Sequence, residues 1–378
     1  MNFFNDKIKK VEKENRLREL KKIDKIIGKK IYIDGKQYVD FSSNNYLGLR
    51  DDKRVIEVAH FAIDKYGLGS GASRIVSGDA DIFYEFEKNI AKFHNKESAL
   101  IFNSGYDANV GIISAIMTKE DIIFTDKYNH ASIYDGMFLS NAKIIRYSHN
   151  NITDLEEKLI KYRDSYKKAM VVTDSVFSMD GDKGNLKEIE KLKIKYDFIF
   201  MVDEAHGIGI FGENGNGIVN EQQIKSADII MGTLGKAFGL TGAYVASSQS
   251  IIRYLINYSR SFIFSTMLPP AIIASANKTL ELIQNEKFRR EKIIELSNYL
   301  RQELKYKGYN TLESNTQIVP VIFNSDIDAI KISKKLYENN LYVPAIRYPA
   351  VPANKPRLRI SINFNITKED IDKIIINL

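Results

Sequence analysis

Short apolar runs alternate with amphipathic helical patterns through the middle of the chain, and this alternation constrains the fold more than any other feature. Runs of strand type occupy residues 98–103, 121–126, 143–148, 169–175, 198–204, 227–234 and 242–248. Runs that are apolar on both faces are typical of a parallel sheet covered by helices on each side. The sequence therefore predicts an α/β fold with a mostly parallel central sheet, at whose carboxyl edge ligands usually bind.

Segments of different character flank this region. Apolar residues recur at helical spacing through residues 1–20, and two strand-type runs surround the Asp34-Gly35 pair. After about residue 270 a long polar helical segment leads into a second α/β pattern. The expected division is an N-terminal helix and hairpin in 1–42, a large domain in 43–269 and a small C-terminal domain in 270–378.

Composition excludes several classes of chemistry. The 378 residues include no cysteine, which rules out disulfides, thiolate metal sites and thiol nucleophiles. The net charge of +7 comes mainly from lysines interleaved with acidic residues, a pattern of solvated helix faces and not of a nucleic-acid footprint. The start has no signal-type apolar run, and no stretch approaches the length of a membrane span. We expect a cytoplasmic protein without nucleic-acid or membrane partners.

The stretch VDEAHGIG, at residues 202–209, contains the four letters that mark a helicase nucleotide site. A nucleotide-driven motor also needs an upstream phosphate loop that ends in Gly-Lys-Ser or Gly-Lys-Thr. The nearest match, GTLGKAFG, lies downstream of Asp203 and has Ala237 where Mg²⁺ binding requires a hydroxyl. Both the order of the motifs and the residue types argue against a motor.

The same residues meet the requirements of pyridoxal phosphate (PLP). This cofactor needs a lysine for its aldehyde, a carboxylate for its pyridinium nitrogen and donors for its phosphate. Asp203 at a strand end can supply the carboxylate, and Lys236 in a glycine-flanked turn can supply the amine. His206 can reach the phenolic oxygen. Glu204 is expected to point away from the ring and to matter least, because adjacent side chains on a strand alternate.

The phosphate and the ring of the cofactor need further contacts. Ser104, Gly105 and Tyr106 stand at a predicted strand-to-helix junction, where free N–H groups favour an anion. Thr233 is placed to hydrogen-bond the phosphate, and His130 to stack on the pyridine. Each of these residues also has an ordinary interpretation as a turn, core or surface residue. Their order along the chain and their places at strand ends favour PLP.

The motifs resemble those of the α-oxoamine synthases, fold-type I PLP enzymes that condense an amino acid with an acyl thioester. The resemblance spans nearly the whole chain, and the runs follow the order of the family: FSSNNYLGL, GSGASRIVSG, SGYDANVG, HASIYDG, VFSMDGD, VDEAHGIG, GTLGKAFG, STMLPP and RLRIS. It implies an enzyme that releases CO₂ and the thiol, works as a homodimer and uses no metal.

The resemblance also implies roles around the cofactor. Lys236 would bond to the cofactor and later act as acid and base, while Asp203 would pair with the pyridinium. Ser178 would join His206 at the phenolic oxygen, and His130 would stack on the ring.

Further roles concern the substrates and a second subunit. Arg359 would bind the carboxylate of the amino acid in bidentate fashion, and Asn44 would face the substrate. Ser265 and Thr266 would reach the phosphate from the other subunit. Arg18 is a weaker candidate for the distal end of the acyl chain, with a helix-surface arginine as the alternative.

Three positions depart from the family pattern: Asn45 replaces an aspartate, Ala72 a glycine and Phe83 a histidine. We expect the chemistry to survive, because the lysine, the aspartate and two histidines remain. The run PAIRYPAVPANKPRLRIS is similar to members that join alanine to a pimeloyl thioester, carried by CoA or acyl-carrier protein, in biotin synthesis. The alternatives are a member that uses glycine and acetyl-CoA or another α-oxoamine synthase, and, more remotely, a non-catalytic binding subunit.

Overall fold

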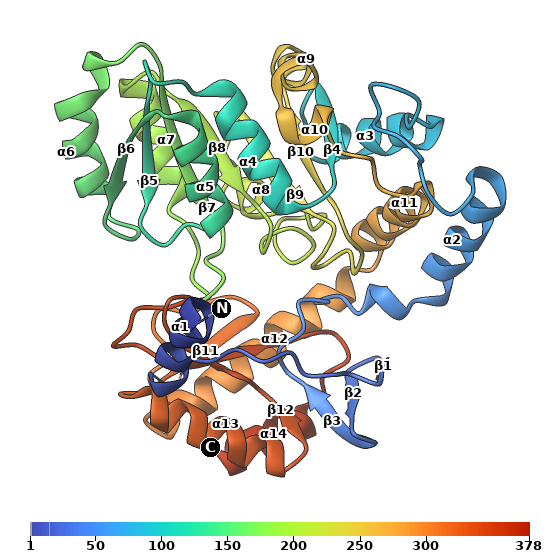
Figure 1. Ribbon diagram of the computed structural model, residues 1–378, viewed down its shortest axis with the longest axis vertical. Helices are drawn as coiled ribbons and strands as arrows, with labels where there is room; N and C mark the ends of the chain where they lie inside the picture. Colours follow the sequence, from blue (N-terminus) through green and yellow to red (C-terminus); the bar gives the residue numbers. More distant parts are fainter. Residues whose placement is uncertain (1, 15) are drawn as a thin grey trace. The chain divides into compact units, whose positions relative to one another are not determined.

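The computed structural model describes residues 2–14 and 16–378 (Figure 1). The chain divides into two compact units. The first, which we call the sheet unit, comprises Leu49–Ser178 and Lys183–Arg290. The second, the terminal unit, comprises the residues up to Gly48 together with Met179–Asp182 and Glu291–Leu378.

A seven-stranded sheet, with strand order β4-β10-β9-β8-β7-β5-β6, forms the centre of the sheet unit. Its strands are β4 (Ser98–Phe102), β5 (Ile122–Asp126), β6 (Lys143–Tyr147), β7 (Ala169–Asp174), β8 (Ile199–Asp203), β9 (Ile229–Thr233) and β10 (Ala243–Ser247). β10 pairs antiparallel with both neighbours, while β6, β5, β7, β8 and β9 pair in parallel. The predicted fold class, a mostly parallel sheet with helices around it, is confirmed.

Helices surround this sheet, and several of them begin at a capping side chain. They are α2 (Lys53–Tyr66), α3 (Asp81–Phe93), α4 (Gly105–Ile116), α5 (Ala131–Ser140), α6 (Ile152–Tyr162), α7 (Leu186–Lys195), α8 (Ile218–Glu221), α9 (Gln249–Tyr258), α10 (Arg260–Ile263) and α11 (Pro270–Asn285). Asp52, Asn151 and Ser248 each accept an N–H of the first turn that follows. Apolar residues of α4, α5, α9 and α10 pack with strand residues in one buried cluster. This packing fixes the strand ends that carry the candidate site.

The terminal unit contains two smaller sheets. β1 (Lys25–Ile27), β2 (Lys30–Ile33), β3 (Lys36–Asp40) and β12 (Leu341–Tyr342) form one, and β11 (Ile318–Ile322), β14 (Arg357–Ser361) and β13 (Ala345–Ile346) form the other. Helices α13 (Asp326–Glu338) and α14 (Lys368–Asn377) belong to this unit, as does most of α12 (Lys287–Tyr306). The predicted hairpin is present: Asp34 and Gly35 both have positive φ, 50° and 73°, as a tight two-residue turn of β2–β3 requires.

The N-terminal helix is shorter than the sequence predicts. α1 spans Asn2–Lys13 and buries none of its side chains, and Leu20 is fully exposed in a segment without regular structure. A helix of this length is marginal without an apolar surface to cover, which explains its early end. Met1 and Asn15, which the prediction also included, lie outside the described residues.

The two compact units divide the chain differently from the predicted domains. α11, expected in the small domain, belongs to the sheet unit, where it packs against α2 and α3. The hairpin segment and the C-terminal segment share the terminal unit, because β12 pairs with β3 across a long sequence separation. Among residues 2–14 and 16–378, no helix combines the length and the apolarity needed to cross a bilayer.

Candidate active site

The carboxyl edge of the central sheet gathers polar residues from neighbouring strands. Asp174 ends β7, Asp203 ends β8 and Thr233 ends β9, and all three side chains are buried. Polar groups removed from water need partners or a ligand, so this edge is where a bound molecule is expected.

Asp203 is held by two N–H donors. Its Oδ2 accepts a 2.8 Å hydrogen bond from Nδ2 of Asn109, and its Oδ1 accepts one of 2.9 Å from the backbone N of Ala205. Asn109 lies on α4 and is almost fully buried. These donors stabilise the charged carboxylate, which suits a group intended to face a pyridinium nitrogen.

A chain of side chains leads from Asp203 to His130. Nδ2 of Asn109 also donates to Oγ of Ser132 over 2.9 Å, and this hydroxyl lies 2.8 Å from Nδ1 of His130. His130 stands at the N-cap of α5. Burial lowers the pKa of the His130 imidazole, and the positive charge of Lys236 acts in the same direction, while Asp203 opposes both. Burial thus favours the neutral ring, and the predicted stacking and pairing residues belong to one network.

The junction between β4 and α4 fits a phosphate. Oγ of Ser104 accepts the N–H of Asp107 over 3.0 Å and so caps the helix that begins at Gly105. A Cβ at Gly105 would lie 2.6 Å from Cγ2 of Thr233, so only glycine allows this close approach. Oγ1 of Thr233 is buried and has no hydrogen-bond partner among the described residues. An unpaired hydroxyl beside a helix N-terminus is a fitting place for an anion.

The side chain of Tyr106 takes another direction. Its ring is half exposed, and its hydroxyl donates to a carboxylate oxygen of Asp135. A phosphate contact from this residue would therefore come from its backbone N–H in the first turn of α4.

Lys236 lies in a tight turn after β9. The N–H of Leu234 donates to O of Gly242 over 2.9 Å, and the N–H of Gly239 donates to O of Lys236 over 2.9 Å. The lysine is partly buried, and its positive charge acts on the titration of both His130 and Asp174. The lysine thus belongs electrostatically to the same cluster as the strand-end carboxyls.

Glu204 and His206 follow Asp203 in a buried turn. The carboxylate of Glu204 accepts Oγ–H of Ser175 over 2.7 Å and the N–H of Val219 over 2.6 Å, so it serves partners different from those of Asp203. The predicted opposite orientation agrees with these contacts. Glu204 nevertheless matters to the fold, contrary to the expectation that it would matter least, because its bond to Val219 fixes the segment that leads to α8.

Ser178, the other predicted contact of the phenolic oxygen, is partly buried in the loop after β7.

The loop between α10 and α11 carries Ser265 and Thr266. The carbonyl of Thr266 accepts a 2.7 Å hydrogen bond from Nδ2 of Asn103 at the end of β4. Its side chain is exposed and that of Ser265 is half-buried. Their contribution to the site of a second subunit stays a prediction.

In the terminal unit, Arg359 and Asn44 are joined through Tyr46. Nη2 of Arg359 donates to the hydroxyl of Tyr46 over 3.2 Å, and this hydroxyl donates to Oδ1 of Asn44 over 3.1 Å. Nη1 of Arg359 donates to Oγ of Ser361 over 2.6 Å. Burial raises the pKa of the Tyr46 phenol. Sequence reasoning missed Tyr46, although it stands within the quoted FSSNNYLGL run.

Arg18 lies on the irregular segment that follows α1 and is exposed. It lines a pocket of about 690 Å³ within the terminal unit. Other cationic members of this lining are Arg16, Lys21, Lys334 and Arg347. The predicted helix-surface alternative for Arg18 is wrong, because no helix extends to this position.

The three departures from the family pattern have local explanations. The positive φ in the glycine-rich loop falls on Gly71, at 68°, so Ala72 meets no backbone strain. Phe83 is fully buried, and the guanidinium of Arg74 lies 5.0 Å from its ring centroid. The N–H of Asn45 donates to Oγ of Ser43 over 3.1 Å, a contact that needs no side-chain carboxylate.

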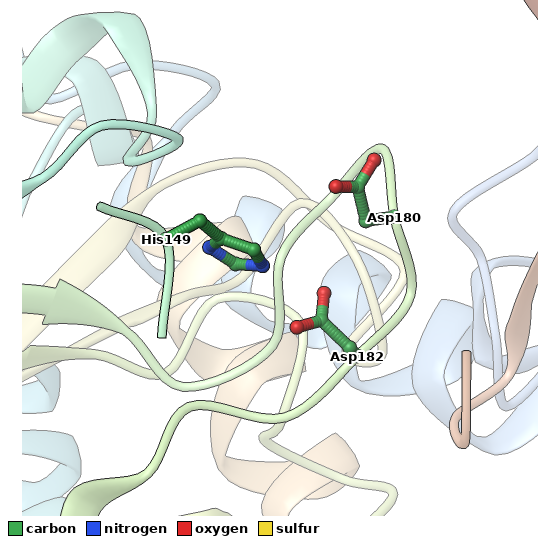
Figure 2. A group of neighbouring side chains, drawn as sticks. All are labelled: His149, Asp180 and Asp182. Carbon is green, nitrogen blue, oxygen red and sulfur yellow. The ribbon is translucent and has the colours of Figure 1, made fainter. Parts of the chain in front are cut away.

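Figure 2 shows three side chains of the types that bind metals, His149 after β6 and Asp180 and Asp182 after β7. Within the sheet unit, Nδ1 of His149 lies 3.1 Å from Oδ1 of Asp126. Within the terminal unit, Asp180 pairs with Arg357. The expectation that the enzyme needs no metal stays a prediction.

Comparison with known proteins identifies the family to which this chain belongs. A protein-family model described as aminotransferase class I and II matches residues 36–378. The chain belongs to this family. An 8-amino-7-oxononanoate synthase from Geotalea daltonii is 41% identical over 99% of this chain and 96% of its own length.

Solved structures agree with this assignment. A serine palmitoyltransferase from S. paucimobilis with bound PLP and myriocin superposes with a TM-score of 0.93, at 29% identity, over 99% of this chain and 95% of that chain. An 8-amino-7-oxononanoate synthase from Francisella tularensis gives 0.79 at 34% identity, over 90% and 97%. The protein is therefore a fold-type I, PLP-dependent acyltransferase of the α-oxoamine synthase group. Bound PLP provides an electron sink for a carbanion next to an amino group.

Proposed function

We propose that this enzyme joins L-alanine to a pimeloyl thioester and forms 8-amino-7-oxononanoate in biotin synthesis. A C–C bond forms between Cα of alanine and the carbonyl carbon of the thioester, whose C–S bond breaks and releases the thiol. The bond between Cα and the carboxylate also breaks and releases CO₂. The observation that supports this choice of substrates is the 41% identity to an 8-amino-7-oxononanoate synthase across nearly the whole chain.

The residues of the sheet unit would bind the cofactor and transfer the proton of the amino acid. Nζ of Lys236 would hold the cofactor before substrate enters, then take the proton from Cα and return one to Cα after CO₂ has left. Asp203, with its donors Asn109 and Ala205, would keep a negative charge at the pyridinium nitrogen. The helix N-terminus at Gly105 and the Thr233 hydroxyl, which has no partner in the described part of the chain, would bind the phosphate. His130, His206 and Ser178 would orient the ring.

The residues of the terminal unit are proposed to bind substrate. Arg359 would pair with the carboxylate of the amino acid, oriented by Tyr46 and Ser361. Holding the carboxylate in one orientation selects the bond that breaks, and small misplacements cost rate steeply. Arg18 would meet the distal end of the acyl chain in the cationic pocket. We also propose a homodimer in which Ser265 and Thr266 contact the phosphate bound by the other subunit.

A second candidate uses another amino acid. Serine palmitoyltransferases superpose well on this chain, and a glycine C-acetyltransferase would use the same group of side chains. A non-catalytic binding subunit is disfavoured, because such a protein has no need to keep Lys236.

The deciding experiment supplies alanine, glycine and serine singly to the purified holoenzyme and titrates the absorption band of the cofactor. Alanine with pimeloyl-CoA or with pimeloyl-acyl-carrier protein should then yield 8-amino-7-oxononanoate, identified by mass. Saturation by glycine or serine but not by alanine would refute the proposal. Borohydride should attach the cofactor to the peptide that contains Lys236, and Lys236→Ala should prevent this attachment.

A further inference from the structure

Two carboxyl groups lie side by side at the carboxyl edge of the sheet. Asp174 and Asp203 end adjacent parallel strands and pair directly in the register of β7 and β8. Residues paired in this way direct their side chains to the same face, on strands about 4.8 Å apart. Each residue is only 4% exposed, so water does little to screen the repulsion between the two carboxylates.

The two carboxyls differ in their donors. Asp203 accepts one N–H at each oxygen. Among the residues that the structure describes, Asp174 accepts one hydrogen bond, from the backbone N–H of His130 over 3.1 Å at Oδ2. Its Oδ1 is buried and has no partner within the part of the chain that the structure describes. Asp203 is therefore the better place for a negative charge.

The surrounding charges do not balance two carboxylates. The groups that act on the titration of Asp174 are Asp203 from β8, Asp126 from β5 and Lys236 from the turn after β9, and the backbone N–H of His130 adds a hydrogen bond. The neutral phenols of Tyr134 and Tyr147 also lie within its electrostatic reach. Among these groups Lys236 is the one cation beside three carboxyls, and the ring of His149 lies beside Asp126. Burial raises the pKa of Asp174 well above its usual range, and the charge of Asp203 raises it further.

We propose that Asp174 holds a proton on Oδ1 at neutral pH, so that the pair carries one negative charge and that charge stays on Asp203. Two adjacent carboxyls that share one negative charge divide their roles in this way in other proteins. The proton belongs on Oδ1 because Oδ2 already accepts an N–H. Asp174 is then a positioning residue: it places His130 through the backbone and keeps Asp203 charged for the pyridinium. The inference concerns the cofactor site and holds whichever amino acid and thioester react.

Infrared difference spectroscopy of the holoenzyme tests the proton directly. Protein labelled with carbon-13 at the side-chain carboxyl of aspartate should show, at pH 7.5, a protonated-carboxyl band that is shifted by the label. Glu204 is also a buried carboxyl, but its band would not shift with labelled aspartate. Absence of a shifted band would overturn the proposal without any need for a variant.

Two matched variants assign the band. Asp174→Asn imitates the protonated carboxyl, so the band should vanish while the affinity for PLP stays within about threefold of wild type. Asp203→Asn removes the charged member, so the affinity should fall by about tenfold or more. Equal losses in both variants, or a band that survives Asp174→Asn, would overturn the proposal. If Asp174→Asn does not fold, Asp174→Ser offers a smaller neutral acceptor for the N–H of His130 and is read by the same two measurements.

Discussion

Nδ2 of Asn109 lies 2.8 Å from Oδ2 of Asp203 and 2.9 Å from Oγ of Ser132. One buried amide therefore connects the carboxylate proposed for the pyridinium to the hydroxyl beside His130. The connection joins two successive helices, α4 and α5, to β8, which lies much further along the chain.

Asn109→Leu should weaken cofactor binding while the protein still folds. The variant removes an N–H donor to a buried carboxylate, a contact of about 1.5–3 kcal/mol, so the dissociation constant for PLP should rise by roughly ten- to a hundredfold. Fluorescence titration of the apoprotein measures it, with circular dichroism as the check on folding. Ser132→Ala is the matched control, because it leaves the Asp203 contact intact and should change affinity much less. Equal effects of the two variants would contradict the role given to Asn109.

Thr233→Val should act in opposite directions on the apoprotein and on cofactor binding. The substitution keeps the shape but removes a buried hydroxyl that has no partner among the described residues, so the apoprotein should gain up to about 1 kcal/mol of stability. The same change removes a proposed phosphate donor, and PLP affinity should fall by roughly tenfold. Thermal unfolding without cofactor and PLP titration measure the two effects. A variant that binds PLP as well as wild type would remove Thr233 from the phosphate site.

Glu204→Gln should alter the pH dependence of stability. Burial raises the pKa of Glu204 to about 7 in the folded chain, against about 4.3 when unfolded. The protonated carboxyl therefore contributes stability that is complete below about pH 4 and is lost as the pH rises towards 7, by roughly 3.5 kcal/mol in total. Glutamine stays neutral and can keep both the Val219 and the Ser175 contacts. The variant should thus gain on wild type as the pH rises from 5 to about 7.5.

Chemical denaturation at a series of pH values measures this difference. The exposed Glu85→Gln serves as the control and should follow the wild-type curve. Parallel curves for Glu204→Gln and wild type would show that Glu204 does not titrate in this range.

Tyr46→Phe should raise the KM for the amino acid by roughly five- to tenfold and should also lower kcat, because a misplaced carboxylate slows bond breaking. The phenol oxygen accepts from Arg359 and donates to Asn44, so its loss frees the guanidinium to reorient. Steady-state kinetics with the amino acid varied at saturating thioester distinguishes the two constants. Lys292→Met, on α12, is a control in the same unit, outside the Asn44–Tyr46–Arg359 group. A change confined to the KM for the thioester would contradict the proposed binding of the carboxylate.

Local sequence patterns determined the elements of this protein. The apolar runs predicted each strand of the central sheet, because a strand buried on both faces needs continuous apolar residues. Asp34 and Gly35 predicted the turn of the β2–β3 hairpin, because both tolerate positive φ. The residue types at strand ends also pointed to PLP, since Asp203 and Lys236 provide the required carboxylate and amine.

Only the tertiary structure decided which of these groups meet. The register of β7 and β8 places Asp174 beside Asp203, and α4 carries Asn109 to the same carboxylate. The sequence contains Asn109 within SGYDANVG, but its partner is 94 residues away. The sequence also could not show that α1 ends at Lys13. Helical spacing predicts a longer helix, but a helix needs an apolar surface to pack against, and only the tertiary structure shows whether one is present. Periodicity along a chain determines local structure, whereas hydrogen bonds between distant segments depend on how those segments pack.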